Sequence, residues 1–139
     1  MRIKTELIDT LKELARKSDV RSQHASAIID RKTGKIMALA SNYHFHKPYN
    51  TKWKLEGKYT MHAEEAVFNK FKRNYPHLLK RGDNRYDLIV VRADRHEDGC
   101  LHSKPCHKCT QMLRKLIKKK IIYRVYYSVI STCQPVHEP

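Results

Sequence analysis

The sequence predicts an α/β domain in which helices cover the faces of a mixed β-sheet. Three segments carry apolar residues at helical spacing, and four shorter segments are apolar or alternate as strands do. Their order is helix, strand, strand, helix, strand, helix, strand, which places helices against a single sheet. The 139 residues fit one domain spanning 1–139, large enough for a hydrophobic core without disulfide bonds.

The first predicted elements are an amphipathic helix over residues 4–17 and a β-hairpin. Apolar residues of the helix fall on one face: Leu7, Ile8, Leu11, Leu14 and Ala15. Two strands follow over residues 24–30 and 35–40, and the turn between them contains Gly34. We therefore expect the helix to be followed directly by two paired strands.

Residues 42–59 lose this periodicity and are predicted to form a long loop. The segment is rich in histidine, lysine and aromatic residues, the latter at Tyr43, Phe45, Tyr49, Trp53 and Tyr59. Bases stack on aromatic side chains and lysines contact phosphates, so the loop is a candidate for gripping a substrate. The alternative is that the aromatic residues cover the sheet while the lysines are solvated. Loops of this length in compact domains are often functional.

A second helix is predicted over residues 61–74, because apolar residues recur at helical spacing and Pro76 prevents its continuation. Residues 86–92 form a short, largely apolar run rich in β-branched residues, typical of a central strand covered on both faces. The polar residues 93–104 are expected to form a loop.

The last predicted elements are a helix over residues 106–118, which begins behind Pro105, and a strand over residues 121–130. The tail over residues 131–139 is expected to be frayed. A strand, helix and strand in succession normally make a right-handed crossover. The strands on either side of this helix are therefore expected to be parallel.

The chain is strongly basic. Lysine and arginine total 29 against 14 acidic residues, a formal net charge of +15 at pH 7. Such a charge predicts an anionic partner, either a nucleotide or a nucleic acid, and does not distinguish the two. No apolar run approaches the roughly 20 residues of a membrane helix, so no membrane partner is expected. The N-terminus lacks the features of a secretory signal, which favours a cytoplasmic location.

Two short motifs can together build a metal site: His62-Ala63-Glu64 and Pro105-Cys106-His107-Lys108-Cys109. One histidine and two cysteines give zinc three protein ligands and leave a fourth position for water, as in catalytic sites. Cys106 and Cys109 are three residues apart and so share one face at a helix start, where the helix dipole lowers thiol pKa values. In a reducing compartment, metal ligation is favoured over a disulfide.

A competing interpretation joins the two cysteines of this C-x-x-C to Cys100 or His102 in a local structural zinc site. His62 and Glu64 would then be incidental. Otherwise, Cys100 and Cys133 are interpreted as buried or idle thiols.

The combination of H-x-E and P-C-x-x-C resembles the cytidine deaminase superfamily. The resemblance spans most of the chain and implies a three-layer α/β/α sandwich of the cytidine deaminase-like type with a mixed sheet. It implies that Zn²⁺ is bound by one histidine and two cysteines, which are His62, Cys106 and Cys109 in this chain. It also implies that Glu64 is the proton shuttle and that Asn42 and Ala63 contact the substrate.

The resemblance has one gap, because the Gly-rich stretch that often follows the asparagine is replaced here by Tyr43-His44-Phe45-His46. Phosphate and ring contacts therefore cannot be transferred to this chain. Family members often assemble, so a homo-oligomer is expected on the resemblance alone.

The implied chemistry is hydrolytic conversion of a cytosine base to uracil. Zinc lowers the pKa of a coordinated water from about 15.7 toward 7, and Glu64 can move the protons. A mononucleotide or nucleoside of the dCMP or cytidine type is the expected substrate. Two alternatives stay open: a deaminase of single-stranded DNA, RNA or tRNA, and a non-catalytic, zinc-stabilised module that binds nucleic acid.

Overall fold

A computed structural model describes residues 3–46, 58–94, 100–128 and 135–137 of the chain. Within these residues, six strands form one sheet: β1 (His24–Asp30), β2 (Ile36–Ser41), β5 (Tyr86–Ala93), β6 (Cys100–Leu101), β7 (Ile122–Tyr127) and β8 (Val136–His137). The strand order is β2-β1-β5-β7-β8, and β6 pairs with β5. The sheet is mixed, because β5 and β7 are parallel whereas the other described pairs are antiparallel.

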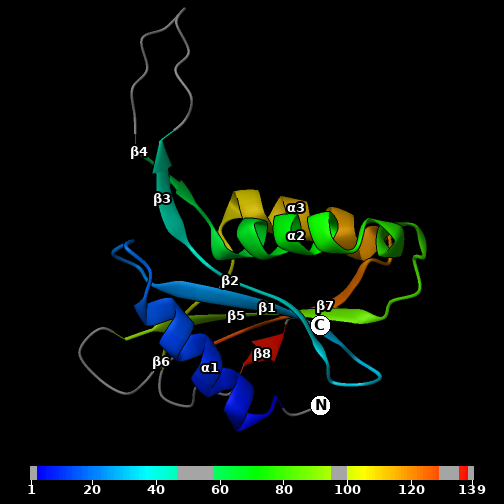
Figure 1. Ribbon diagram of the computed structural model, residues 1–139, viewed down its shortest axis with the longest axis horizontal. Coiled ribbons are helices and arrows are strands. Elements are labelled where there is room, and N and C mark those ends of the chain that lie inside the picture. Colours follow the sequence, from blue (N-terminus) through cyan, green and yellow to red (C-terminus); the bar gives the residue numbers. More distant parts are fainter. Residues whose placement is uncertain (1–2, 47–57, 95–99, 129–134, 138–139) are drawn as a thin grey trace, which may run out of the picture.

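Helices cover both faces of this sheet (Figure 1). The helix α1 (Thr5–Arg16) lies on one face, and α2 (Ala63–Asn74) and α3 (His107–Lys118) lie on the other. A short 3₁₀ helix, η1 (Pro76–Lys80), follows α2. The strands β3 (Tyr43–His46) and β4 (Lys58–Met61) pair with each other as a separate antiparallel sheet, on the same side as α2 and α3.

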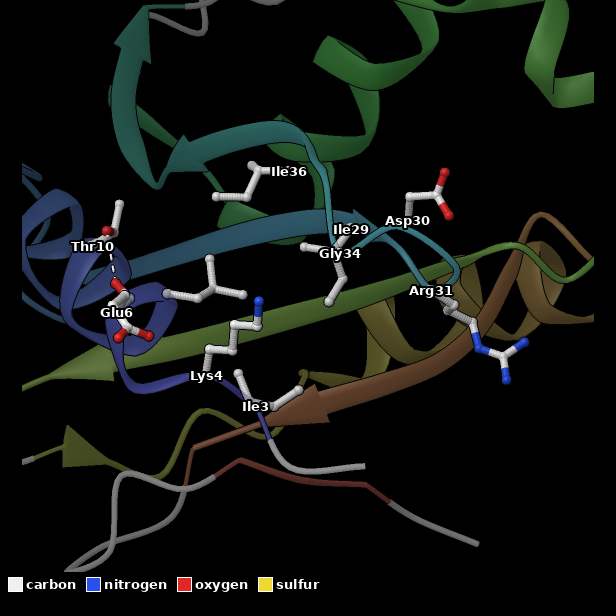
Figure 2. A pocket seen from close by; sticks show the side chains of 10 residues that line it. Ile3, Lys4, Glu6, Thr10, Ile29, Asp30, Arg31, Gly34 and Ile36 are labelled. Carbon is white, nitrogen blue, oxygen red and sulfur yellow. Dashed lines mark hydrogen bonds between the residues drawn. The ribbon is translucent and has the colours of Figure 1, made fainter.

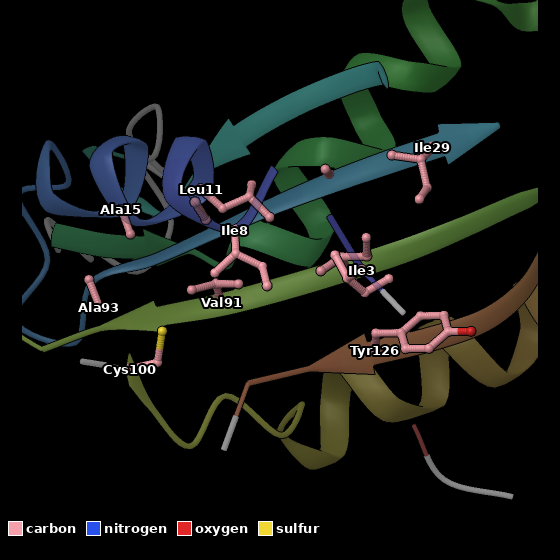
Figure 3. Close-up of a cluster of buried hydrophobic side chains, with 12 residues drawn as sticks. Ile3, Ile8, Leu11, Ala15, Ile29, Val91, Ala93, Cys100 and Tyr126 are labelled. Carbon is pink, nitrogen blue, oxygen red and sulfur yellow. The ribbon is translucent and has the colours of Figure 1, made fainter. Parts of the chain in front are cut away.

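The side-chain alternation of the central strands divides the core into two clusters. Ala27 and Ile29 of β1 and Val91 of β5 pack with α1, where Leu11 is fully buried (Figure 3). Ile28 of β1 and Leu88 of β5 face the other way and pack with residues of α2 and α3: Val67, Phe71, Leu113 and Leu116. Because successive side chains of a strand point to opposite faces and both faces are covered, β5 is largely apolar, with Asp87 and Arg92 as its two charged residues.

The structure confirms the predicted mixed α/β organisation, the order of the main elements and the central position of β5. It also confirms the parallel pairing of β5 with β7, which flank α3. Boundaries differ from the predicted ones by at most three residues, close to the usual uncertainty of helix and strand ends.

Three predicted irregular segments contain strands, so those predictions were wrong in part. The predicted loop 42–59 contains β3 and β4, the loop 93–104 contains β6, and the tail 131–139 contains β8. These strands span two to four residues, too short to show the alternation by which strands are recognised. Tyr49 and Trp53 of the predicted loop, and Cys133, lie outside the described residues.

Among the described residues, no helix combines the length and the apolar character that a membrane span requires.

The turn between β1 and β2 is organised by Asp30. Its carboxylate accepts hydrogen bonds from the backbone N–H groups of Lys32 and Thr33, at 2.9 and 3.4 Å, and from Arg85 Nε at 2.9 Å. Gly34 closes the turn with a φ of 75°, in the left-handed region that favours glycine. Burial raises the pKa of the Asp30 carboxyl, but these hydrogen bonds outweigh it and hold the pKa below its usual value.

We expect Asp30→Asn to reduce the free energy of unfolding at pH 7 by about 1–3 kcal/mol, because the ionised partner of Arg85 is lost. The folded-state pKa lies below the unfolded one, so the carboxylate stabilises the fold above the unfolded pKa, about 3.9. That contribution disappears as the pH falls through the folded pKa. Urea unfolding at pH 7 and pH 3.5 checks this.

The difference in the free energy of unfolding between wild type and Asp30→Asn should be smaller at the lower pH. An equal difference at both pH values would contradict a stabilising role for the ionised Asp30 carboxylate. Asp9→Asn, on the exposed face of α1, is the matched control and should have little effect at either pH.

Candidate metal centre

The N-termini of α2 and α3 meet over the sheet and bring the two motifs together. His62 is the N-cap residue of α2, and Cys106 is the N-cap residue of α3. Both have extended backbone geometry, so their side chains lie ahead of the first helical turn. The Sγ of Cys106 accepts a hydrogen bond from the backbone N–H of Cys109 at 3.5 Å, which fixes the C-x-x-C turn.

His62, Cys106 and Cys109 form a compact group that can hold a metal ion. Nδ1 of His62 lies 3.5 Å from Cys106 Sγ and 3.3 Å from Cys109 Sγ, and all three ligand atoms lie within 4.8 Å of one another. Zinc takes sulfur at about 2.3 Å and nitrogen at about 2.0 Å, so a tetrahedral site separates these ligand atoms by roughly 3.5 Å. The donor set and its spacing therefore fit zinc.

The competing structural site receives no support from the described residues. Cys100 lies in β6 and is buried in the α1-side core, on the face of the sheet opposite α3 (Figure 3). His102 is exposed and is not part of the metal-competent group, which His62 completes instead.

The expectation that the helix start lowers the pKa of the thiols is wrong for Cys109. Burial, followed by the nearby charges of Glu64 and Cys106, raises the pKa of the Cys109 thiol well above its ordinary value. The side chain is fully buried, so desolvation of the thiolate outweighs the helix dipole. A cation bound between the sulfurs would reverse this balance, because coordination deprotonates a thiol.

Glu64 lies in the first turn of α2, next to the ligand group but outside it. The residue is only 4% exposed, and burial raises the pKa of its carboxyl above the usual value despite the nearby His62 and Cys109. The adjacent Glu65 faces another way and pairs with Lys108 of α3 at 3.6 Å. The two neighbouring carboxylates therefore have different surroundings, and Glu64 is the one at the pocket.

A pocket of about 320 Å³ opens beside the ligand group. Its lining includes every residue that the sequence analysis assigned to the site except Cys109: Asn42, His62, Ala63, Glu64 and Cys106. The lower limit for typical small-molecule pockets is about 300 Å³. The pocket is therefore large enough for a small ligand.

Asn42 directly follows β2 and is 4% exposed. Its Oδ1 accepts a hydrogen bond from the backbone N–H of His24 at 3.0 Å, and its Nδ2 donates to the carbonyl of Ser22 at 2.7 Å. Asn42 therefore fixes the start of β1 while it lines the pocket. Each amide end retains one further hydrogen-bonding position, which is available in principle to a ligand.

The polar residues of this pocket that were not predicted include His24, Thr60, Arg92 and Lys104. They come from β1, β4, β5 and the segment before α3, so no local spacing connects them. The one available signal was Arg92, one of two charged residues in a largely apolar central strand.

His24 holds one orientation in this pocket. Its Nδ1 lies 3.0 Å from the carbonyl of Ser22, which can only accept, so Nδ1 carries the hydrogen and Nε2 is the acceptor in the neutral ring. Burial lowers the pKa of His24, and the nearby guanidinium of Arg92 acts in the same direction. The ring is therefore neutral at pH 7.

A buried hydroxyl network holds the segment that leads into Cys106. Ser103 Oγ donates to the carbonyl of Val90 at 2.8 Å, and Ser128 Oγ donates to the carbonyl of Leu101 at 2.7 Å. The backbone N–H of Ser128 donates to Ser103 Oγ at 2.7 Å. These bonds attach the segment to the ends of β5 and β7 and so fix where α3 begins.

A second pocket of about 320 Å³ lies between α1 and the β1–β2 turn (Figure 2). Its wall is mostly apolar and includes Ile3, Leu7, Ile29 and Ile36. None of the metal-competent residues lines it, so it is separate from the candidate centre.

The group of one imidazole and two sulfurs at two helix starts, with a buried carboxylate beside it, is a candidate metal centre. No protein-family model matches the sequence, and no curated protein matches it.

Proposed function

We propose that this protein is a zinc-dependent hydrolytic deaminase that converts a cytosine base to uracil, acting on a mononucleotide or nucleoside. One observation carries the proposal: the buried Glu64 lines the same pocket as His62 and Cys106 of the metal-competent group. Three protein ligands leave a coordination position for substrate chemistry, whereas structural zinc sites normally have four.

The metal would be held by His62, Cys106 and Cys109, and zinc bound there supplies the Lewis acidity that makes water nucleophilic at neutral pH. Glu64 accepts a proton from the attacking water and delivers it to N3 of the cytosine, beside the attacked C4. It then takes up the remaining proton of the hydroxyl group added at C4 and passes it to the amino group, which leaves as ammonia while the C4 carbonyl forms. The sum is cytosine plus water giving uracil plus ammonia.

The pocket supports this role for Glu64. A buried carboxyl has a pKa raised toward neutrality, which suits a group that must both take up and release a proton near pH 7. Ala63 lies between the ligand and the acid and also lines the pocket, so its backbone can contact the base. Asn42 also lines the pocket and can contact the sugar through its remaining hydrogen-bonding positions.

We also propose that the fold is the three-layer α/β/α sandwich of the cytidine deaminase-like type. The position of α1 on one face of a mixed sheet and of α2 and α3 on the other supports it (Figure 1). The two helix starts that carry the site motifs belong to the same layer.

Incubation of zinc-loaded protein with dCMP, deoxycytidine and a cytosine-containing single-stranded oligonucleotide tests the function. We expect uracil products and ammonia from dCMP or deoxycytidine, detected by chromatography. Preferential conversion of the oligonucleotide would favour a polynucleotide deaminase. Binding of the oligonucleotide without conversion of any substrate would favour a non-catalytic nucleic-acid-binding module.

A further inference from the structure

The pocket beside the metal-competent group is lined by an arginine, Arg92, whose guanidinium group lacks a hydrogen-bond partner at one nitrogen among the described residues. Arg92 is the penultimate residue of β5 and is partly buried. Within the described part of the chain, its Nε atom is buried and has no hydrogen-bond partner. A buried, unpaired N–H of a charged group is costly, so such a group normally has an acceptor.

Strand register directs Arg92 toward the metal side of the sheet. Arg92 is paired with His24 across the antiparallel β1 and β5, so the two side chains share one face. Leu88, four residues earlier in β5, packs on the α2 and α3 side, and the two-residue period places Arg92 on that side as well. The starts of α2 and α3, with the metal ligands, cover this face.

The described lining of the pocket is cationic. It contains Arg92 and Lys104, and its one acidic residue is Glu64, which lies beside the ligand group. The described lining therefore carries more basic than acidic side chains.

We propose that Arg92, assisted by Lys104, binds the phosphate of a nucleotide, which makes a nucleoside monophosphate the preferred substrate. The guanidinium is a planar fork of N–H donors that matches the oxygens of a phosphate, and a pocket wall restricts its orientation. This inference rests on the proposed function, because it specifies the substrate of the same site. The volume of about 320 Å³ is large enough for a small ligand.

The kinetic test compares dCMP with deoxycytidine, which differ only in the phosphate. We expect Arg92→Gln to lower kcat/KM for dCMP by about 10- to 100-fold, mainly through KM, because phosphate binding is equal in the ground and transition states. For deoxycytidine, kcat/KM should change by less than about threefold. Arg92→Lys keeps the positive charge but loses the paired N–H donors of the guanidinium, so its kcat/KM for dCMP should lie between those of wild type and Arg92→Gln.

Two further variants distinguish an effect of the pocket from an effect of the overall positive charge of the protein. Arg114→Gln removes the same group from the exposed face of α3, away from this pocket, and should leave the preference for dCMP unchanged. Lys104→Gln should weaken the preference less than Arg92→Gln, because Lys104 is exposed and its charge is screened. Zinc content and circular dichroism establish that each variant is folded and loaded.

A binding measurement keeps this inference separate from the proposed function. Calorimetric titration of the zinc-loaded protein with dCMP and with deoxycytidine reports phosphate recognition whether or not either compound is converted. If neither is deaminated yet dCMP binds more tightly through Arg92, the proposed function fails and the phosphate site stands.

Three results would overturn the inference. Equal affinities for dCMP and deoxycytidine would show that the pocket does not recognise phosphate. Equal losses on both substrates in Arg92→Gln would show a structural role for Arg92. A higher kcat/KM for an oligonucleotide without terminal phosphates than for dCMP would show that the phosphate belongs to a strand.

Discussion

Glu64→Gln is expected to lower kcat on a cytosine substrate by about 100- to 10,000-fold, because the amide cannot accept and return a proton. Glutamine nearly matches glutamate in shape, so the buried position in α2 should be preserved. Glu64 is not one of the metal-competent residues, so the zinc content should equal that of the wild type. Steady-state kinetics and elemental analysis of the same preparation check both parts.

Glu65→Gln is the matched control for this change. Glu65 is the next residue of the same helical turn, but its carboxylate pairs with Lys108 on the surface. Surface pairs of this kind contribute little to stability, so the control should retain activity and fold. Equal activity of wild type and Glu64→Gln would exclude Glu64 as the proton shuttle. Equal losses in both glutamine variants would indicate a general electrostatic effect.

Removal of the metal is expected to lower the melting temperature by roughly 10 °C, because a ligand that binds the folded state at 100 to 1,000 times its Kd adds about 2.7–4.1 kcal/mol. His62 and Cys109 belong to different helices, so a shared ion joins the starts of α2 and α3. Thermal unfolding with and without a strong chelator measures the effect. Cys109→Ser should unfold at a lower temperature and should no longer respond to the chelator.

Cys100→Ala is the control for the metal experiment. Cys100 is a buried thiol on the other face of the sheet, so its loss should reduce stability through packing while the chelator response persists. If Cys100→Ala abolished the response and His62→Ala preserved it, the metal would be held by the local structural site.

Each half of the metal-competent group was predictable from local spacing, whereas the meeting of the two helix starts depends on the tertiary fold. The three-residue spacing of Cys106 and Cys109 places both at one helix start, and the periodicity after His62 places that residue at another. The main strands were recognisable for a similar reason, since the β-branched run of β5 reflects burial on both faces.

The remaining wall of the pocket could not be predicted from local patterns. His24 and Arg92 become neighbours only through the register between β1 and β5, which joins distant parts of the chain. The pairing of β3 with β4 depends on backbone hydrogen bonds between short strands and leaves little alternation in the sequence. The pKa of Cys109 also depends on tertiary burial, which outweighs the helix dipole that the sequence indicated.

The central claim is that one zinc ion is bound by His62, Cys106 and Cys109. Zinc quantification combined with X-ray absorption spectroscopy on the purified protein tests it most directly. We expect one zinc per chain, with two sulfur ligands and a histidine nitrogen, and loss of the nitrogen signal in His62→Ala. Protein without stoichiometric zinc after loading, or zinc with three or four sulfur ligands, would contradict it.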